Sequence, residues 1–385
     1  MILNQGRYRL APVFISAYIF GLAFGLAPTI AFSATEKVLN INNWAEYIGQ
    51  NTVKNFEKET GIKVRYDNFD SNEVLLAKVI AGQTGYDIVI PSSDFGRIMI
   101  DGGKVQKLDR KQLSNWGNLN PAVMQQMAKL DPGNQYMVPW LGGSVSVGYN
   151  VDKVKTALGT EPIPANSFDL VFNQKYTAKL KKCGITMLDS ASDVFPSALI
   201  YVGKPAFSSN VADYKVAADM LQKVRKDIKL FTNNGHIADL AVGNICVALG
   251  YGSDFNNAAF QAKQAKNGIR IEAPLPPNGM QFGFESMMIP IDAPHRENAL
   301  LWMNYILRPQ VQAEITNYTL FTSPNLAARK YIDPDVLANK IAFPPDDYLA
   351  NKAQFYQVRS NATRRVMTRA FTKLKSGLLR SLGTR

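Results

Sequence analysis

Residues 38–91 read VLNINNWAEYIGQNTVKNFEKETGIKVRYDNFDSNEVLLAKVIAGQTGYDIVIP. Three short β-prone stretches alternate here with two segments of helical spacing, and both helical segments end at a glycine. The expected strands are 38–42, 62–67 and 86–90, and the expected helices are 52–60 and 71–81. Alternating strands and helices indicate a parallel sheet with right-handed crossovers, so this stretch predicts an α/β fold.

A second α/β unit is predicted from about Gly142 to Gln261. It contains strand-like segments and segments of helical spacing, here 145–149, 217–224, 237–242 and 245–249. The glycines at 142 and 143 could mark a crossing between two lobes. Further along, 298–308 predicts a strong helix that stops at Pro309. A mature chain of about 350 residues is too long for one ordinary core, so we expect two domains.

The first 33 residues have the pattern of a secretory signal peptide. Arg7 and Arg9 precede an apolar run from Leu10 to about Phe32, and small residues follow. An uncleaved membrane anchor is the alternative, because about 20 apolar residues can span a bilayer. No second run of that length follows, so we expect cleavage after Ser33 and export. No cysteine lies near this site, which argues against a lipid anchor.

The formal net charge of +12 is concentrated at the two ends of the chain. Residues 34–358 contain 33 basic and 31 acidic residues, whereas 359–385 contain eight basic residues and no acid. A near-neutral body gives no reason to expect nucleic-acid binding. The basic tail predicts an amphipathic helix docked on the body, and contact with a membrane or transporter is the alternative.

The chain has two cysteines, Cys183 and Cys246, and two histidines. In an oxidising compartment a pair of cysteines indicates one disulfide, and two buried thiols are the alternative. His236 and His295 lie far apart in sequence, so no structural zinc site is expected.

Acidic and aromatic residues recur where predicted strands end. Asn43-Trp44-Ala45-Glu46-Tyr47, Ser92-Ser93-Asp94 and Gly250-Tyr251-Gly252-Ser253-Asp254 are three such exits. In open α/β sheets, ligands bind beyond the carboxyl ends of the strands. Asp70, Ser71 and Asp94 could instead cap the helices that follow, and we favour this role for Asp70 and Ser71.

A site of carboxylates and aromatic faces without basic residues favours cations. Ammonium groups form charge-assisted hydrogen bonds with carboxylates, and a ring face adds about 0.5–2 kcal/mol to binding of a desolvated cation. Acids spread over several segments suit a ligand with two separated charges. No loop offers the compact set of oxygens that calcium needs, so no metal or cofactor is expected. A sugar site is the main competing interpretation.

Several motifs resemble the periplasmic putrescine- and spermidine-binding proteins, and the putrescine-binding branch most of all. They extend over nearly all of the mature chain, and the most specific are Asn43-Trp44-Ala45-Glu46-Tyr47-Ile48, Tyr86-Asp87-Ile88-Val89-Ile90-Pro91-Ser92 and Asn304-Tyr305-Ile306-Leu307-Arg308-Pro309. The resemblance implies a binding protein without enzymatic activity that delivers a polyamine to the permease of an ABC transporter in the periplasm. We also expect a monomer that binds no nucleic acid.

The resemblance further implies a two-lobe periplasmic binding protein fold (type II). Each lobe would be a mostly parallel sheet flanked by helices, and crossing strands would form the hinge. We place lobe 1 at 34–141 and 263–310, and lobe 2 at 142–262 and 311–385. The family's disulfide would join Cys183 to Cys246.

The family's ligand-binding positions fall on ten residues of this sequence. The expected set is Trp44, Glu46, Tyr47, Ser92, Asp94, Asp193, Tyr251, Asp254, Glu285 and Phe321. Trp44, Tyr47 and Tyr251 would be aromatic walls, and Glu46, Asp193, Asp254 and Glu285 would accept ammonium groups.

The chain departs from the family pattern at several of these positions. Ala45 stands where serine is usual, Tyr251 replaces a tryptophan, Phe321 replaces a tyrosine and Gly283 falls at an aromatic position. Glu46 and Glu285 stand for aspartates, Asp193 stands for a glutamate and Asp94 stands for a small hydroxyl residue. The acidic positions of the predicted site are retained while the sizes and shapes of its side chains change. Another cationic amine or a guanidino compound is therefore an alternative ligand.

A secreted hydrolase is the remaining alternative. Paired carboxylates such as Glu46 and Asp254 could hydrolyse glycosides. The sequence has no Gly-x-Ser-x-Gly motif, and its two histidines lie in neither metal nor triad spacing, which argues against this class.

Overall fold

The computed structural model describes residues 37–45 and 47–377. The predicted signal peptide and Glu46 lie outside the described residues. The strands are β1 (Val38–Trp44), β2 (Lys63–Phe69), β3 (Ile88–Val89), β4 (Val138–Asn150), β5 (Ile185–Met187), β6 (Leu230–Phe231), β7 (Val247–Tyr251), β8 (Ile271–Glu272), β9 (Met280–Met287) and β10 (Ala353–Phe355).

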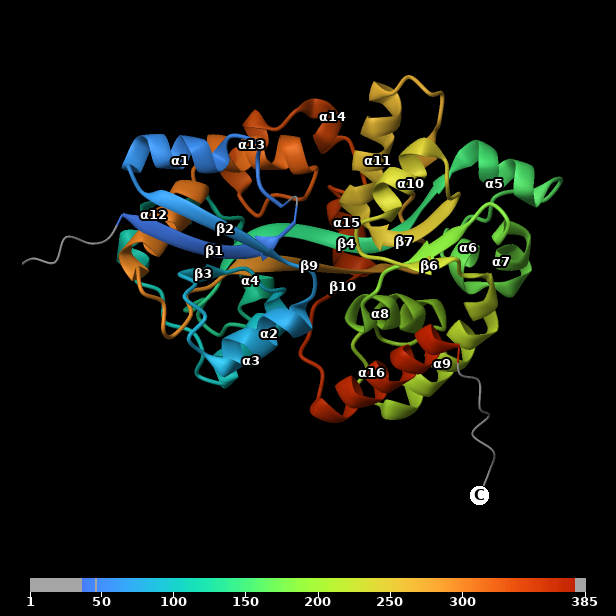
Figure 1. Cartoon of the computed structure of the whole chain (residues 1–385), viewed down its shortest axis with the longest axis horizontal. Coiled ribbons are helices and arrows are strands. Elements are labelled where there is room, and N and C mark those ends of the chain that lie inside the picture. Colours follow the sequence, from blue (N-terminus) through green and yellow to red (C-terminus); the bar gives the residue numbers. More distant parts are fainter. Residues whose placement is uncertain (1–36, 46, 378–385) are drawn as a thin grey trace, which may run out of the picture. The chain divides into compact units, whose positions relative to one another are not determined.

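The helices lie on both faces of these strands (Figure 1). The α-helices are α1 (Thr52–Thr60), α2 (Asn72–Ala81), α3 (Ser93–Asp101), α4 (Pro121–Met127), α5 (Val151–Leu158), α6 (Asp169–Phe172), α7 (Gln174–Leu180), α8 (Ala191–Tyr201), α9 (Val211–Val224), α10 (His236–Val242), α11 (Gly252–Gln264), α12 (Arg296–Ile306), α13 (Pro309–Thr319), α14 (Pro334–Leu337), α15 (Asp346–Asn351) and α16 (Asn361–Ser376). The 3₁₀ helices are η1 (Arg110–Gln112), η2 (Ser114–Asn118), η3 (Arg225–Asp227) and η4 (Leu326–Tyr331).

The first sheet has the parallel order β2–β1–β3, as the opening stretch predicts. Local sequence signals set the lengths of the helices between these strands. The Oγ of Ser71 accepts a hydrogen bond from the backbone N–H of Val74 and caps α2, which confirms the capping role expected for Ser71. Helix α1 ends at Gly61, whose φ of 71° is a left-handed conformation that glycine adopts without strain.

The second sheet has the order β10–β9–β4–β7–β5–β6, and β8 pairs with β4. Strand β4 is antiparallel to β9 over its first half and antiparallel to β7 over its second half. Isolated bridges also link this region to the first sheet, from Met288, just after β9, to Val89 of β3, and from Glu285 of β9 to Ser92, which follows β3. In Figure 1 both β4 and β9 run across the middle, between helices α1–α3 and helices α5–α9. They are the crossing strands of a two-lobe α/β fold.

Each lobe has its own hydrophobic core. Leu39 and Ile41 of β1 face the same side and are buried with Trp302 of α12. In the other lobe, Val147 from the second half of β4 is buried with Phe195 of α8. Side chains from distant segments therefore close each core, and the crossing strand β4 contributes to both.

The disulfide and the docked tail are both confirmed. Cys183 and Cys246 form a disulfide that joins residues 63 positions apart. The tail forms α16 as far as Ser376, and its Met367, Phe371 and Leu374 are buried in the core that contains α8 and α9. The apolar face of α16 thus packs on the body, while Arg365, Arg369, Lys373 and Lys375 stay exposed.

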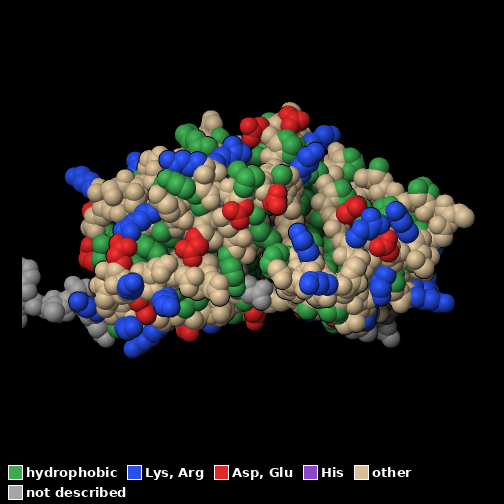
Figure 2. Space-filling model, turned by 90° about the horizontal axis from the view of Figure 1, so that it is seen from above, with side chains coloured by type: hydrophobic (Ala, Val, Ile, Leu, Met, Phe, Trp, Pro, Cys, Tyr) green, Lys and Arg blue, Asp and Glu red, His purple; other side chains and the backbone are tan. Residues whose placement is uncertain are grey.

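Lysines and arginines are interspersed with aspartates and glutamates on the face shown in Figure 2. This mixture agrees with the near-neutral charge of residues 34–358. Within residues 37–45 and 47–377, no helix has the length and apolarity needed to cross a membrane.

Candidate ligand-binding site

A cavity lies where the two lobes meet. Its walls come from the ends of β1 and β7, the starts of α2, α3 and α8, the crossing strands β4 and β9, and two C-terminal segments. The lining residues are Trp44, Tyr47, Asn72, Ser92, Leu141, Gly142, Gly143, Asp193, Tyr251, Glu285, Phe321 and Tyr356. No described lysine or arginine lines this cavity.

A second cavity adjoins the first. The rings of Trp44, Tyr47, Tyr251 and Phe321 line both cavities. The rest of the second cavity is lined by five polar residues, Asp70, Asn233, Asn234, Asp254 and Asn257, and by Ala45, Phe69 and Ile237. It also lacks lysine and arginine among the described residues. The two cavities thus share aromatic walls, and each has two acidic residues in its lining, Asp193 and Glu285 in the first and Asp70 and Asp254 in the second.

The structure brings eight of the ten predicted site residues to these cavities. Seven line the first cavity, namely Trp44, Tyr47, Ser92, Asp193, Tyr251, Glu285 and Phe321. Asp254 lines the second. Asp94 lines neither, because its buried carboxylate pairs with Arg359. Glu46 lies outside the described residues.

Glu285 is held in place from two sides. Trp44 Nε1 donates to Oε2 of Glu285 and Ser92 Oγ donates to Oε1, each over 3.1 Å. The amide of Asn72 in turn donates to Ser92 Oγ over 2.8 Å. Burial raises the pKa of Glu285 to about 8, although the hydrogen bond from Ser92 lowers it. The two hydrogen bonds therefore fix the orientation of the carboxyl group. A cation bound beside it would favour its ionised form.

Asp193 lies in the first turn of α8, on the opposite lobe. Tyr251 Oη donates to Asp193 Oδ2 over 3.1 Å, so one aromatic wall also orients this carboxylate. Burial raises the pKa of Asp193 to about 6, against the hydrogen bonds from Ser190 and Tyr251. Two desolvated acids from different lobes thus face one cavity.

Asp254 lies in the first turn of α11 and is buried. Its Oδ2 is 2.9 Å from Nε2 of His236, which is also fully buried. Nδ1 of His236 has no hydrogen-bond partner among the described residues. A carboxylate oxygen accepts, so Nε2 of His236 donates to Oδ2 of Asp254 and holds this carboxylate in place. Sequence reasoning had assigned no role to His236.

The aromatic walls are continuous. The ring centroids of Tyr47 and Phe321 are 4.1 Å apart, and those of Trp44 and Phe69 are 4.4 Å apart. Trp140 Nε1 donates to the carbonyl of Tyr47 over 3.2 Å and fixes the loop after β1. Flat faces held this way can accept a methylene chain or a cation.

Tyr356 is a wall residue that sequence reasoning missed. Its ring lies against the backbone of Gly283, where an added Cβ would come within 2.1 Å of the Tyr356 ring. The aromatic position that appears lost at Gly283 is thus filled by a ring from the segment after β10. The sequence contains a glycine at a position that is aromatic in the family and a tyrosine in the C-terminal region. Nothing in the sequence indicates that these two residues are in contact.

Two α/β lobes around a cavity with acidic and aromatic walls define a two-lobe binding protein. The family model described as bacterial extracellular solute-binding protein matches residues 51–345, and the chain belongs to this family. The putrescine-binding periplasmic protein SpuD of Pseudomonas aeruginosa is 40% identical over 359 residues, which cover 92% of this chain and 97% of SpuD. The putrescine-binding periplasmic protein PotF of Escherichia coli is 41% identical over 364 residues, 94% of this chain and 98% of PotF.

A solved structure of a substrate-binding protein has a similar fold. The spermidine/putrescine ABC transporter substrate-binding protein PotD of Streptococcus pneumoniae matches with a TM-score of 0.70 at 24% identity, over 88% of this chain and 98% of that chain. The predicted fold and family are confirmed. The matched family and these relatives are binding proteins, so the chain is a solute-binding protein and not an enzyme.

Proposed function

We propose that this protein captures a polyamine, with putrescine as the preferred ligand, and delivers it to the permease of an ABC transporter. One observation carries the proposal. Two adjoining cavities are lined by Asp193, Glu285, Asp254 and four shared aromatic rings, and by no described lysine or arginine. The alignments with SpuD and PotF cover nearly the whole chain, and the names of both proteins describe putrescine binding.

The chemistry of a diamine matches this lining. Each ammonium donates charge-assisted hydrogen bonds to a carboxylate, and its positive charge also favours the ionised form of that acid. The rings of Trp44, Tyr47, Tyr251 and Phe321 would cover the methylene chain and add cation–π attraction at its ends. A neutral sugar would leave desolvated carboxylates without positive partners, so it fits less well.

We assign the ligand contacts in two groups. Asp193 and Glu285 would hold one ammonium, with Ser92 and Trp44 orienting Glu285. Asp254 would hold the other, oriented by His236. Asp94 is left out, because Arg359 already occupies its carboxylate. The role of Glu46 stays a prediction.

We also propose how the chain is divided and where it works. The hinge would consist of β4 and β9, as the predicted boundaries near 141 and 263 suggest. Ile315 of α13 is buried with Ile41 of β1, so we assign α13 to lobe 1 rather than to lobe 2. Export by cleavage after Ser33, residence in the periplasm and a monomeric state without nucleic-acid binding also belong to the proposal.

Titration calorimetry on the purified protein tests the proposal. Putrescine, spermidine, spermine, cadaverine and agmatine are titrated in turn at pH 8. We expect putrescine to bind with a free energy of roughly −8 to −10 kcal/mol, because a transport protein must also release its ligand. A response to agmatine alone would favour the guanidino alternative. No measurable binding of any of the five amines would overturn the proposal.

A further inference from the structure

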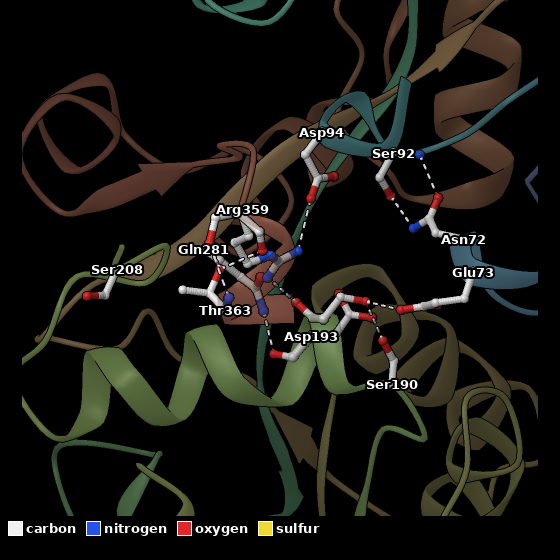
Figure 3. A network of polar contacts seen from close by, with 12 residues as sticks. Asn72, Glu73, Ser92, Asp94, Ser190, Asp193, Ser208, Gln281, Arg359 and Thr363 are labelled. Atoms are coloured by element: carbon white, nitrogen blue, oxygen red, sulfur yellow. Dashed lines mark hydrogen bonds and ion pairs between the residues drawn. The ribbon is translucent and has the colours of Figure 1, made fainter. Parts of the chain in front are cut away.

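Arg359 and Asp94 form a buried ion pair that joins distant parts of the chain. The guanidinium donates to Oδ2 of Asp94 over 2.9 Å and to the carbonyl of Ser192 over 3.2 Å. The side chains of Arg359 and Asp94 are only 3% and 7% exposed. Asp94 belongs to α3 on one lobe, and Ser192 to α8 on the other. Figure 3 shows Arg359 pointing toward Asp94 and toward the first turn of α8.

This pair lies directly behind one end of the first cavity. Ser192 is followed by Asp193, and Arg359 is three residues beyond Tyr356, and both Asp193 and Tyr356 line the cavity. Ser92, two residues before Asp94, holds Glu285. Gln281 of β9 donates to the carbonyl of Asp193 and completes this wall (Figure 3). The charges of Asp94 and Arg359 are therefore next to the two carboxylates that we assign to one ammonium.

Apart from Asp193 and Glu285, the charged groups described near the pair, Arg364 and Glu73, are more exposed than the pair. Arg364 in the first turn of α16 is half-buried and donates to Asn361. Glu73 of α2 is exposed and accepts a hydrogen bond from Ser192 Oγ over 3.1 Å. The ring of Phe207 covers the Arg359 guanidinium at 5.3 Å. Among the described residues, Arg359 is thus the buried cation at this end of the cavity.

We propose that Arg359 is a specificity-determining residue, a resident cation that neutralises Asp94 and excludes a further ligand ammonium from this end of the cavity. The inference rests on the proposed function. With Arg359 in place, Asp193 and Glu285 are the carboxylates left for the ligand here. A longer polyamine that extended its next ammonium toward Asp94 would meet the guanidinium, and like charges in close contact oppose binding. The pair therefore selects diamines over triamines and tetraamines.

Removal of the resident charge should reverse this selection. In Arg359→Gln, Asp94 becomes a buried carboxylate without a partner, which an additional ligand ammonium can satisfy. Arg359→Lys keeps the charge, and the double variant Asp94→Asn/Arg359→Gln removes both charges. Arg308→Gln is the matched control, because it removes an arginine from the exposed pair with Glu59.

The measurement is the ratio of the spermidine and putrescine dissociation constants, by calorimetry at pH 8. We expect Arg359→Gln to lower this ratio at least about tenfold, and Arg359→Lys, the double variant and Arg308→Gln to stay near the wild-type ratio. An unchanged ratio in Arg359→Gln, or the same lowered ratio in the double variant, would overturn the inference.

A second measurement needs no variant to fold. In a crystal structure of the wild-type protein with spermidine, we expect Arg359 still paired with Asp94 and no ligand nitrogen on Asp94. A ligand ammonium bound to Asp94 would overturn the inference. If the wild-type protein binds no polyamine, the proposed function itself fails. If it binds polyamines and the ratio does not respond to Arg359→Gln, only this inference fails.

Discussion

The indole N–H of Trp44 donates a 3.1 Å hydrogen bond to Oε2 of Glu285, a residue 241 positions further along the chain. This bond and the one from Ser92 favour the carboxylate, whereas burial favours the protonated acid and dominates. The pKa of Glu285 is therefore about 8 in the absence of a ligand. An ammonium ion bound here would lower it sharply, because an opposite charge at contact stabilises the carboxylate.

Binding of putrescine is expected to release a proton near neutral pH. The pKa of Glu285 is about 8 before binding and lower afterwards, so affinity should fall as the pH falls below 8. One such group changes affinity up to about tenfold per pH unit. Calorimetry at pH 7 in buffers of different ionisation enthalpy would count the released protons. Glu285→Gln should lose most of this release, and a wild-type protein that releases none at pH 7 would contradict the pKa shift.

The ligand-free protein should show the opposite trend in stability. Because folding raises the pKa of Glu285 from its usual 4.5 to about 8, the folded state holds this proton more tightly between those values. The free energy of unfolding should therefore decrease as the pH rises from about 4.5 to 8. Burial of Asp193, with a pKa of about 6, acts in the same direction. Thermal unfolding at pH 5, 6.5 and 8 would measure the trend, and its slope should be smaller in Glu285→Gln.

Neutral replacements of the proposed ammonium acceptors should weaken binding strongly. Glu285→Gln and Asp254→Asn each leave a buried ligand ammonium poorly paired, so each should cost about 2–5 kcal/mol of putrescine binding at pH 8. Calorimetry measures the loss, and Asp152→Asn serves as control because that acid pairs with Arg270 in an exposed position. Unchanged affinity in both site variants would mean that the ligand binds elsewhere.

The fold could be predicted from local signals where each element carries its own. Residues 38–91 contain a cap at Ser71 and a stop at Gly61, and their parallel sheet followed from the sequence. The first half of β4 could not be predicted, since Pro139, Gly142 and Gly143 interrupt a strand whose pairing with β9 is a long-range contact.

The site shows the same division. Trp44, Tyr47 and Tyr251 were found because they follow strands whose carboxyl ends meet. Tyr356 was missed, because the three-residue strand β10 is placed by its pairing with β9 and not by a local pattern. Asp94 was predicted as a ligand contact, since nothing in its own neighbourhood reveals a partner 265 residues away.

His236 should act on affinity through Asp254. Because the imidazole donates from Nε2, its removal leaves a buried carboxylate oxygen without a donor and frees Asp254 to reorient. His236→Leu should weaken putrescine binding by about 1–3 kcal/mol, and His236→Gln should recover part of this, because its amide can donate. Calorimetry measures both. Equal losses in the two variants would indicate that His236 acts through packing instead of through its hydrogen bond.

Gly283→Ala tests whether the ring of Tyr356 replaces the aromatic side chain that position 283 lacks. An added Cβ would come within 2.1 Å of the Tyr356 ring, so the ring must move out of the cavity wall. We expect a loss of about 1–3 kcal/mol in putrescine binding, the usual size of an overpacking penalty. Gly117→Ala is the control, because a Cβ there meets no atom within 4 Å.

Tyr356→Ala in the same background separates the clash from other effects of the new methyl group. If the clash alone weakens binding in Gly283→Ala, adding Tyr356→Ala should relieve it, and the double variant should bind like Tyr356→Ala alone. Additive losses would show instead that the methyl group disturbs the crossing strand β9 itself. Wild-type affinity in Gly283→Ala would mean that the ring of Tyr356 has no part in the ligand wall.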